Sequence, residues 1–171
     1  IGSDDGAAGL SAAAALVEDA ADAEVGPHVT TLAARVRAAS RGTLAATHAL
    51  LFGHTTRGLV VPYETEYGNE GLFRASQELA DIGGFVAAFG LRLDPREHER
   101  VDHVSVECEL LSFLARKEAH AAEAGDGAML EATRGAARLF LRDHLARFGR
   151  AFAAILLRED PDGAYGALGA L

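Results

Sequence analysis

The stretch LFRASQELADIGGFVAAFG, residues 72–90, decides the fold class of this chain. Among its larger apolar residues are Leu72, Leu79, Ile82, Val86 and Phe89. They recur at intervals of three, four or seven residues, which places them on one face of an α-helix. Gly90 follows the last of them, as is typical of a helix C-terminus. The stretch therefore predicts a helix that packs one apolar face against a core.

The same periodicity extends over most of the remaining sequence. We expect further helices over residues 10–23, 27–52, 95–124 and a last long helix that carries residues 139–155. The fourth of these is predicted to open at Asp94-Pro95-Arg96-Glu97, a capping-box pattern with proline at the first helical position. No segment alternates convincingly between apolar and polar residues. The prediction is an all-α, single-domain helical bundle.

Length and composition limit the domain count and the class of partner. We expect residues 1–171 to form a single all-helical domain, with residues 1–9 disordered or foreign to the natural protein. The formal charge of −9, from 16 basic and 25 acidic residues, argues against a nucleic-acid surface and suits a cationic partner. Because Cys108 is the only cysteine, no intrachain disulfide is possible, and a cytoplasmic location is expected. Charges interrupt every apolar run well before the roughly 18–20 residues that a membrane span requires.

One connection is longer than helical bundles usually contain: GHTTRGLVVPYETEYGNEG, residues 53–71. Such bundles join their helices with about 2–8 residues, and a longer loop is often functional. This loop combines a proline, two tyrosines and several carboxylates, namely Pro62, Tyr63, Glu64, Glu66, Tyr67 and Glu70. It is predicted to be a recognition surface, and a solvated connector is the alternative.

Asp102-His103, within ERVDHVSVECELLSFLARKEAH (99–120), is the first candidate for catalytic or metal chemistry. His98 and His103 are five residues apart, whereas two zinc ligands on one helix face are four apart. No glutamate in this stretch is followed three residues later by histidine, as a di-iron site would require. Cys108 lies on the apolar stripe and is expected to be buried as a small core residue.

The other histidines give no stronger sign of an active site. His120 and His144 are expected at the boundary of amphipathic helices, with Asp143-His144 as a second solvated pair. The sequence also contains no glycine-rich phosphate loop and no nucleophile elbow. We therefore predict that the protein is not an enzyme and has neither a cofactor nor a metal site.

The spacing around Asp102 favours recognition instead. Glu99, His103 and Glu107 are four residues apart, so on a regular helix they would form one acidic face beside Asp102 and raise the proton affinity of the imidazole. Arginine bridges such carboxylates with bidentate hydrogen bonds. Two structural alternatives remain open: a face paired internally with Arg96 and Arg100, and a role of Asp102 as the cap of the following helix.

Four segments in series resemble a known family. They are VPYETEYG (61–68), ELADIGGFVAAFGL (78–91), ERVDHVSVECELLSFL (99–114) and LFLRDHLARFGRAF (139–152). In this order and spacing, over about residues 45–156, they closely resemble the TorD/DmsD/NarJ family of cytoplasmic chaperones for molybdoenzymes. Two positions depart from the family pattern: Val86 stands where many relatives have tyrosine, and Phe148 where tryptophan is frequent.

The resemblance implies an all-helical chaperone without catalytic activity. Such a chaperone binds the twin-arginine leader and the apo form of a molybdopterin-dependent oxidoreductase subunit, and it delays export until the cofactor is inserted. The motifs of the family fall on Glu99, Asp102 and His103 and on Pro62, Tyr63 and Glu64. With their acidic and aromatic neighbours, the expected peptide-binding set is Pro62, Tyr63, Glu64, Glu66, Tyr67, Glu99, Asp102, His103 and Glu107.

The resemblance also sets the expected partners. They are the molybdoenzyme catalytic subunit and its leader peptide, with no nucleic acid and no stable membrane insertion, and the chaperone itself is a monomer or a domain-swapped dimer. Two other classes remain open: an all-α small-molecule-binding or regulatory bundle whose long loop gates a pocket and, third, a metal-dependent enzyme.

Overall fold

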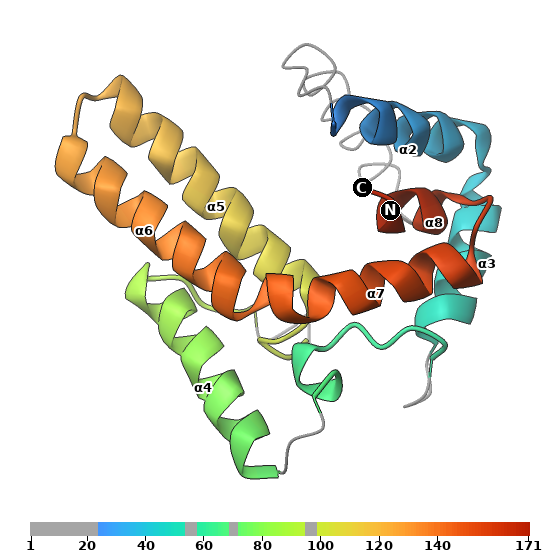
Figure 1. The fold of residues 1–171 in the computed structure, drawn as a ribbon, viewed down its shortest axis with the longest axis horizontal. Helices are drawn as coiled ribbons and strands as arrows, with labels where there is room; N and C mark the ends of the chain where they lie inside the picture. The colour runs from blue at the N-terminus through green and yellow to red at the C-terminus, as the bar shows by residue number, and fades with distance from the viewer. Residues whose placement is uncertain (1–23, 54–57, 69–71, 95–98) are drawn as a thin grey trace. The chain divides into compact units, whose positions relative to one another are not determined.

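The computed structural model describes residues 24–53, 58–68, 72–94 and 99–171, and all regular structure in these ranges is helical (Figure 1). The helices are α2 Gly26–Ala38, α3 Arg41–Phe52, the 3-10 turn η1 Glu64–Glu66, α4 Leu72–Ala88, α5 Val104–Glu123, α6 Gly127–Asp143, α7 Leu145–Glu159 and α8 Ala164–Gly169. No strand occurs in these ranges, so the predicted all-α class is confirmed. The helix predicted over residues 10–23 lies outside the described residues.

The predicted helix over residues 27–52 is wrong in its continuity, because the structure has two helices there. The backbone at Ala39 and Ser40 is extended, with ψ of 137° and 154°. Ser40 then caps α3, since its side chain accepts a hydrogen bond from the Thr43 amide at 3.1 Å. A serine in this position satisfies one of the free amides of the first helical turn.

The fourth predicted helix begins later than its capping-box pattern indicates. Residues 95–98 lie outside the described residues, but residues 99–103 are described and non-helical, and α5 begins at Val104. The predicted face of Glu99, His103 and Glu107 at helical spacing is therefore wrong, because Glu99 precedes the helix.

The predicted last long helix is also two helices, α6 and α7, which are separated at His144. The backbone of His144 has φ −120° and ψ −93°, outside the helical region. The glycine-rich tail after α7 contains the short helix α8. Periodicity alone encodes neither the break at His144 nor this last helix.

The chain divides into two compact units: residues 1–61 with 150–171, and residues 62–149. In the first unit, α2, α3 and α8 bury an apolar cluster of Leu32, Val36, Leu44, Ala164 and Ala167. Arg35 ties α2 to the segment before α8, because its Nη1 donates to the carbonyl oxygens of Pro161 at 2.8 Å and Gly163 at 3.0 Å. The single-domain organisation stays a prediction.

The second unit, residues 62–149, contains both segments of the predicted site. Its core joins α4, α5 and α6 through Ile82, Val86, Leu110, Leu114 and Phe140. The helices α5 and α6 lie side by side as an antiparallel pair (Figure 1). Gly125, at φ 67°, and Asp126, which caps α6 by accepting from the Met129 amide at 2.9 Å, form the turn between them. The apolar face predicted from residues 72–90 thus supplies two of the buried core residues.

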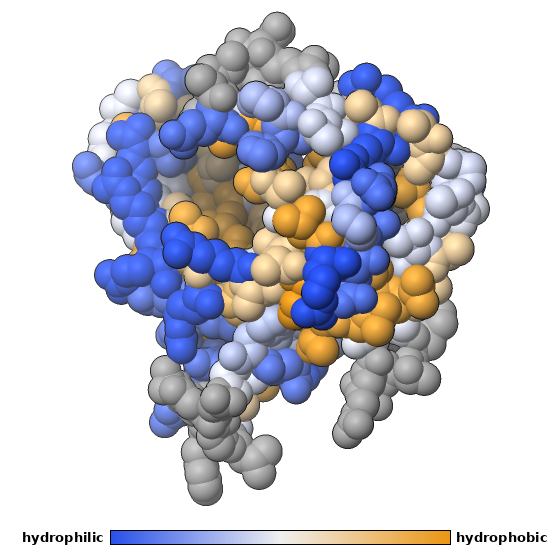
Figure 2. Space-filling model, turned by 45° about the vertical axis from the view of Figure 1, so that its right-hand side comes forward, coloured by the Kyte–Doolittle hydropathy of each residue, from blue (hydrophilic) through white to orange (hydrophobic). Residues whose placement is uncertain are grey.

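The surface mixes polar and apolar side chains. On the face drawn in Figure 2, hydrophobic residues reach the surface among hydrophilic ones. Within the described ranges, no helix combines the length and the apolar character that a membrane crossing requires.

Candidate functional site

The structure brings the two predicted recognition segments together within residues 62–149. An isolated antiparallel bridge pairs Tyr63 with His103. The Glu64 amide donates to the Asp102 carbonyl at 3.0 Å, and the Val104 amide donates to the Pro62 carbonyl at 2.8 Å. The loop and the start of α5 therefore form one continuous backbone structure, although their residues are about 40 positions apart in the sequence.

Both carboxylate oxygens of Asp102 accept hydrogen bonds, and its side chain is fully buried. Arg100 pairs with it in bidentate fashion, from Nε to Oδ1 at 2.9 Å and from Nη2 to Oδ2 at 2.7 Å. Thr65 adds its hydroxyl at 2.8 Å and its amide at 3.3 Å, both to Oδ2. The internal pairing with Arg100, an alternative left open by the sequence, is thus observed, while Arg96 lies outside the described residues.

His103, rather than Asp102, is the N-terminal cap of α5, so the alternative in which Asp102 caps this helix is not observed. The His103 Nδ1 accepts a hydrogen bond from the Ser105 amide at 3.1 Å, which in the neutral ring leaves the proton on Nε2. Burial lowers the pKa of His103 and outweighs the charges of Glu99 and Asp102, which raise it. A positive ring would also lose its capping lone pair at a helix N-terminus. The predicted rise in proton affinity is therefore wrong.

Glu107 lies inside the unit rather than on an acidic surface, and its side chain is fully buried. A hydrogen bond joins its carboxyl group to that of Glu64. Burial, followed by the negative charges of Glu64 and Asp102, raises its pKa to about 9. Glu107 is therefore protonated and uncharged at neutral pH.

Of the remaining members of the predicted set, Pro62 and Glu64 are buried, and Tyr63, Glu66, Tyr67 and Glu99 are at least partly accessible. Glu66 and Glu99 have side chains that are 54% and 42% exposed. Tyr63 is half-buried; its hydroxyl donates to Glu99 Oε2 at 3.3 Å, and its ring carries the Arg100 guanidinium 4.6 Å from the centroid. We call Tyr63, Glu66, Glu99 and His103 the acidic loop face, after the side chains that reach solvent around the Tyr63–His103 bridge.

Tyr67 faces a different environment. Its ring packs against Phe148, with 5.4 Å between the ring centroids, and burial raises its pKa to about 12. Tyr67 is therefore not part of the acidic loop face. It lines the inner of the two hollows described below.

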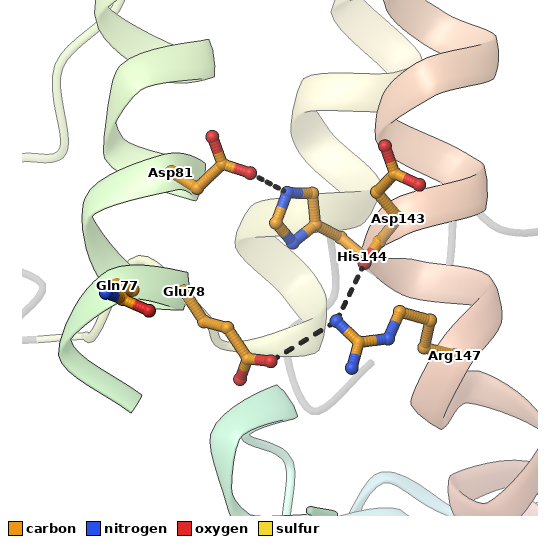
Figure 3. Close-up of a pocket in the computed structure, with 6 residues that line it drawn as sticks. All are labelled: Gln77, Glu78, Asp81, Asp143, His144 and Arg147. Carbon is orange, nitrogen blue, oxygen red and sulfur yellow. Dashed lines mark hydrogen bonds and ion pairs between the residues drawn. The ribbon is translucent and has the colours of Figure 1, made fainter. Parts of the chain in front are cut away.

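His144 is a further residue of the site. Its predicted place in a solvated pair is wrong, because it is only 2% exposed. Its Nδ1 lies 3.1 Å from Glu64 Oε2 and its Nε2 lies 3.2 Å from Asp81 Oδ2. Figure 3 shows Asp81 reaching from α4 towards the imidazole at the junction of α6 and α7. No spacing rule links positions 64, 81 and 144, so periodicity could not have found this cluster.

Charge explains why an imidazole is stable in this buried position. Burial by itself lowers the pKa of His144, but the hydrogen bond and charge of Glu64 and the charge of Asp81 outweigh it, so the pKa is raised. These charges favour the protonated form, in which His144 bridges two carboxylates, one buried and one exposed.

Two neighbouring hollows open beside His144. The outer hollow, of about 630 Å³, is lined by Gln77, Glu78, Asp81, Asp143, His144 and Arg147 (Figure 3). The inner hollow, of about 110 Å³, is lined by Glu64, Thr65, Tyr67, Gly68, Ala75, Glu78, Arg147 and Phe148. Both include the ion pair between Glu78 Oε1 and Arg147 Nη1, at 3.2 Å, and Arg147 also donates to the Asp143 carbonyl at 3.3 Å.

Cys108 is exposed, so its predicted burial in the core is wrong. The apolar stripe of α5 passes through Leu110 and Leu114, and Cys108 lies beside it. Among the described residues, no group of three or more histidine, cysteine, aspartate or glutamate side chains has an arrangement that could hold a metal ion.

Comparison with protein families gives one match. A family model described as nitrate reductase delta subunit matches residues 18–154, which is most of the chain and includes both recognition segments. Neither the curated proteins nor the solved structures give a match.

Proposed function

The chain belongs to the nitrate reductase delta subunit family, and from that premise we propose that it binds the twin-arginine leader of its client. Members of this family are chaperones for nitrate reductase assembly rather than enzymes. The chain therefore has a role in molybdoenzyme maturation, with a molybdoenzyme subunit as its partner. The proposal adds that it holds the apo form of that subunit in the cytoplasm and delays export until the cofactor is inserted.

We assign leader binding to the acidic loop face. Glu66 and Glu99 present carboxylates to solvent, and Tyr63 presents a ring on which a guanidinium can stack. A twin-arginine segment supplies the matching cations, and guanidinium–carboxylate contacts are directional. The buried members of the predicted set, Asp102 above all, hold this face in place.

The observation that carries this assignment is the position of Arg100. Its guanidinium lies over the Tyr63 ring and pairs with Glu66 Oε1 at 3.4 Å, while its other nitrogens bind Asp102. The protein thus already holds one guanidinium on this face, between an aromatic ring and carboxylates. The same groups can accept a second guanidinium on their exposed side.

Titration of a synthetic leader peptide tests the assignment. We expect the double variant Glu66→Gln and Glu99→Gln to bind the leader about two- to thirty-fold more weakly, because two exposed charge pairs contribute roughly 0.2–1 kcal/mol each. The matched control is Glu123→Gln with Glu131→Gln, which removes the same charge from exposed positions of α5 and α6. Equal weakening in both double variants would show that only net charge matters.

The outer hollow favours a second candidate, a small-molecule-binding bundle. Its volume of about 630 Å³ is within the range of ligand pockets, but five of its six lining residues carry ionisable side chains: Glu78, Asp81, Asp143, His144 and Arg147. A stoichiometric small molecule released from the purified protein would support this candidate. Co-purification of a leader-bearing subunit supports the chaperone.

A further inference from the structure

We propose that leader binding weakens as pH rises, because a buried cluster of Glu64, Asp81, Glu107 and His144 holds η1 in place only while it carries two protons. The four residues come from η1, α4, α5 and the junction of α6 and α7, all within residues 62–149. The inference rests on the proposed function, because it adds a regulation to the same peptide site. None of the four residues belongs to the acidic loop face, so each can be changed without removing a proposed contact to the leader.

Glu64 connects this cluster to the acidic loop face. It is the first residue of η1, directly after Tyr63, and Glu66 is the last residue of the same turn. The Glu64 side chain is buried, and its Oε2 lies 3.1 Å from the His144 ring nitrogen Nδ1. Tyr63 and Glu66 are thus fixed on either side of one buried carboxylate. If that carboxylate moves into water, both residues of the face move with it.

The first proton is held by His144. Its Nδ1 lies 3.1 Å from Glu64 Oε2, and its Nε2 lies 3.2 Å from Asp81 Oδ2 (Figure 3). A protonated imidazole donates to both carboxylates, whereas the neutral ring has one N–H and donates to only one of them. In the described part of the chain, His144 is the only cation that pairs with Glu64. Loss of this proton therefore leaves a buried carboxylate without a compensating charge.

The second proton is shared by Glu107 and Glu64. The Glu107 side chain is fully buried on α5, and a hydrogen bond joins its carboxyl group to that of Glu64. Two carboxylates have no hydrogen to donate, so this bond exists only while one of the two groups is protonated. Without the proton, two negative charges are in contact inside the unit and repel each other. Movement of Glu64 into water, together with η1, relieves that repulsion.

The other charged groups around the cluster do not replace these protons, since they are already paired. The pairs are Arg147 with Glu78, Arg142 with Asp143 and Arg100 with Asp102. Asp102 adds to the repulsion, because its negative charge also disfavours ionisation of Glu107 and so raises its pKa. The hold on η1 therefore depends on the two protons.

The direction of each pKa shift sets the pH range. Burial alone lowers the pKa of His144, but Glu64 and Asp81 outweigh burial and raise it above its ordinary 6.5. Burial and the neighbouring negative charges raise the pKa of Glu107 to about 9. The cluster therefore holds both protons at about pH 6 and loses them as pH rises through the folded pKa of His144 and through about 9.

The other ionisable groups beside the cluster and the face titrate outside this range. Burial lowers the pKa of His103 below 6.5, and it raises that of Tyr63 above 10 and that of Tyr67 to about 12. Burial also raises the pKa of the Cys108 thiol, next to Glu107, above 9. A change in leader affinity between pH 6 and 9 can then be assigned with variants of the cluster.

The test measures the Kd of a synthetic leader peptide for the full chain between about pH 6 and 9 at constant ionic strength. The peptide has an acetylated N-terminus and contains no histidine or cysteine, so it does not itself titrate in this range. We expect the affinity of the wild type to fall at least about five-fold over this range, since the Kd rises in inverse proportion to the fraction of protein in the binding form.

Three variants assign the effect. Glu107→Gln keeps a hydrogen-bond donor for Glu64 but does not titrate, so it should retain at least about twice the wild-type affinity at pH 9. His144→Gln keeps a neutral donor, so it should bind about two- to five-fold more weakly than the wild type at pH 6 and approach it at pH 9. His120→Gln, at an exposed position of α5, is the matched control and should follow the wild-type profile.

Tyrosine fluorescence reports the position of η1 without a leader. The chain has three tyrosines and no tryptophan, and Tyr63 and Tyr67 flank η1. Release of η1 should expose both rings, so acrylamide should quench the emission of the wild type more strongly at about pH 9 than at about pH 6. The increase should be smaller in Glu107→Gln. Circular dichroism at both pH values shows that the helices remain folded.

Two results would overturn the inference. One is a leader affinity that stays constant or rises between pH 6 and 9. The other is a wild-type pH profile in both Glu107→Gln and His144→Gln, which would place the titrating group elsewhere in the chain.

The same measurements separate this inference from the proposed function. Leader binding that does not change with pH leaves the chaperone proposal standing and refutes the pH control. No leader binding at any pH refutes leader recognition, and quenching then decides the role of the cluster. Quenching that increases with pH in the wild type but not in Glu107→Gln supports the hold of the cluster on η1, and unchanged quenching refutes it.

Discussion

Two buried charge clusters in residues 62–149 differ in what satisfies their carboxylates. Around Asp102, two bonds from Arg100 and two from Thr65 occupy both carboxylate oxygens. Around His144, the ring lies between Glu64 and Asp81, and the uncharged Glu107 is hydrogen-bonded to Glu64. The first cluster is closed by a permanent cation, whereas the second depends on protons held by His144 and Glu107.

This difference changes the meaning of the Asp102-His103 motif. Its aspartate joins the long loop to the start of α5, and its histidine caps that helix. Both roles hold the acidic loop face in place. Experiment can therefore distinguish the two clusters, because substitutions in the Asp102 cluster should mainly lower stability.

The largest effect is expected from Asp102→Ala. This change leaves the Arg100 guanidinium and the Thr65 amide without their acceptor, and breaking a buried ion pair typically costs about 3–5 kcal/mol. Because Arg100 is 42% exposed and can be rehydrated, we expect a loss near the lower end, about 3 kcal/mol. Denaturant unfolding measures it, with the exposed Glu99→Ala as a control that should change stability by no more than about 0.5 kcal/mol. Equal losses in the two variants would contradict the closed cluster.

A somewhat smaller loss, about 2–3 kcal/mol, is expected from His144→Ala at pH 6, because Glu64 then lacks its cation. The pKa of His144 is raised by Glu64 and Asp81 against the opposing effect of burial. The stability it contributes is therefore fully present below its unfolded pKa of about 6.5 and is lost as pH rises through the folded pKa. Unfolding curves between pH 6 and 9 should converge for the wild type and the variant. A difference that grows with pH would contradict this sign.

Glu107→Gln should have the opposite effect and stabilise the protein. Burial and the charges of Glu64 and Asp102 raise the pKa of Glu107 from 4.5 to about 9. The unfolded chain releases this proton above pH 4.5, so the wild type loses stability between pH 4.5 and 9. At pH 7 glutamine should add on the order of 1–3 kcal/mol, measured by thermal unfolding. A variant less stable than the wild type at pH 8 would show that the carboxyl has an essential partner.

The smallest effect is expected from His103→Ala, which removes the cap of α5. Loss of a side-chain cap typically costs about 0.5–2 kcal/mol, and we expect about 1 kcal/mol here. His103→Asn keeps an acceptor at the same position and should recover most of the loss. If both variants unfold like the wild type, the bond to the Ser105 amide contributes nothing to stability.

The sequence predicted what depends on local pattern. The face containing Ile82 and Val86 is buried as its spacing indicates, and the loop and the Asp102 segment, each identified by its own motif, are adjacent in the structure. The errors share a physical cause. Helix ends at Ser40, His103 and His144 are set by side-chain hydrogen bonds and backbone angles that periodicity does not contain.

The burial of charged residues was the least predictable feature. Glu107 and His144 occur in amphipathic segments where either face is possible, and their partners Glu64 and Asp81 are 43 or more positions away in the sequence. Cys108 shows the reverse error, since a position near an apolar stripe was assigned to the core but is exposed. Only the three-dimensional structure decides which side of each boundary faces the solvent.

The most direct test of arginine-dependent recognition is calorimetric titration of the leader and of a leader with both arginines replaced by alanine, at low and high salt. The acidic loop face predicts that alanine weakens binding about two- to thirty-fold, and that salt weakens the native leader more than the alanine leader. The contrary result is an affinity that changes neither with the arginines nor with salt. Recognition would then depend on apolar contacts, and the acidic loop face would not be the leader site.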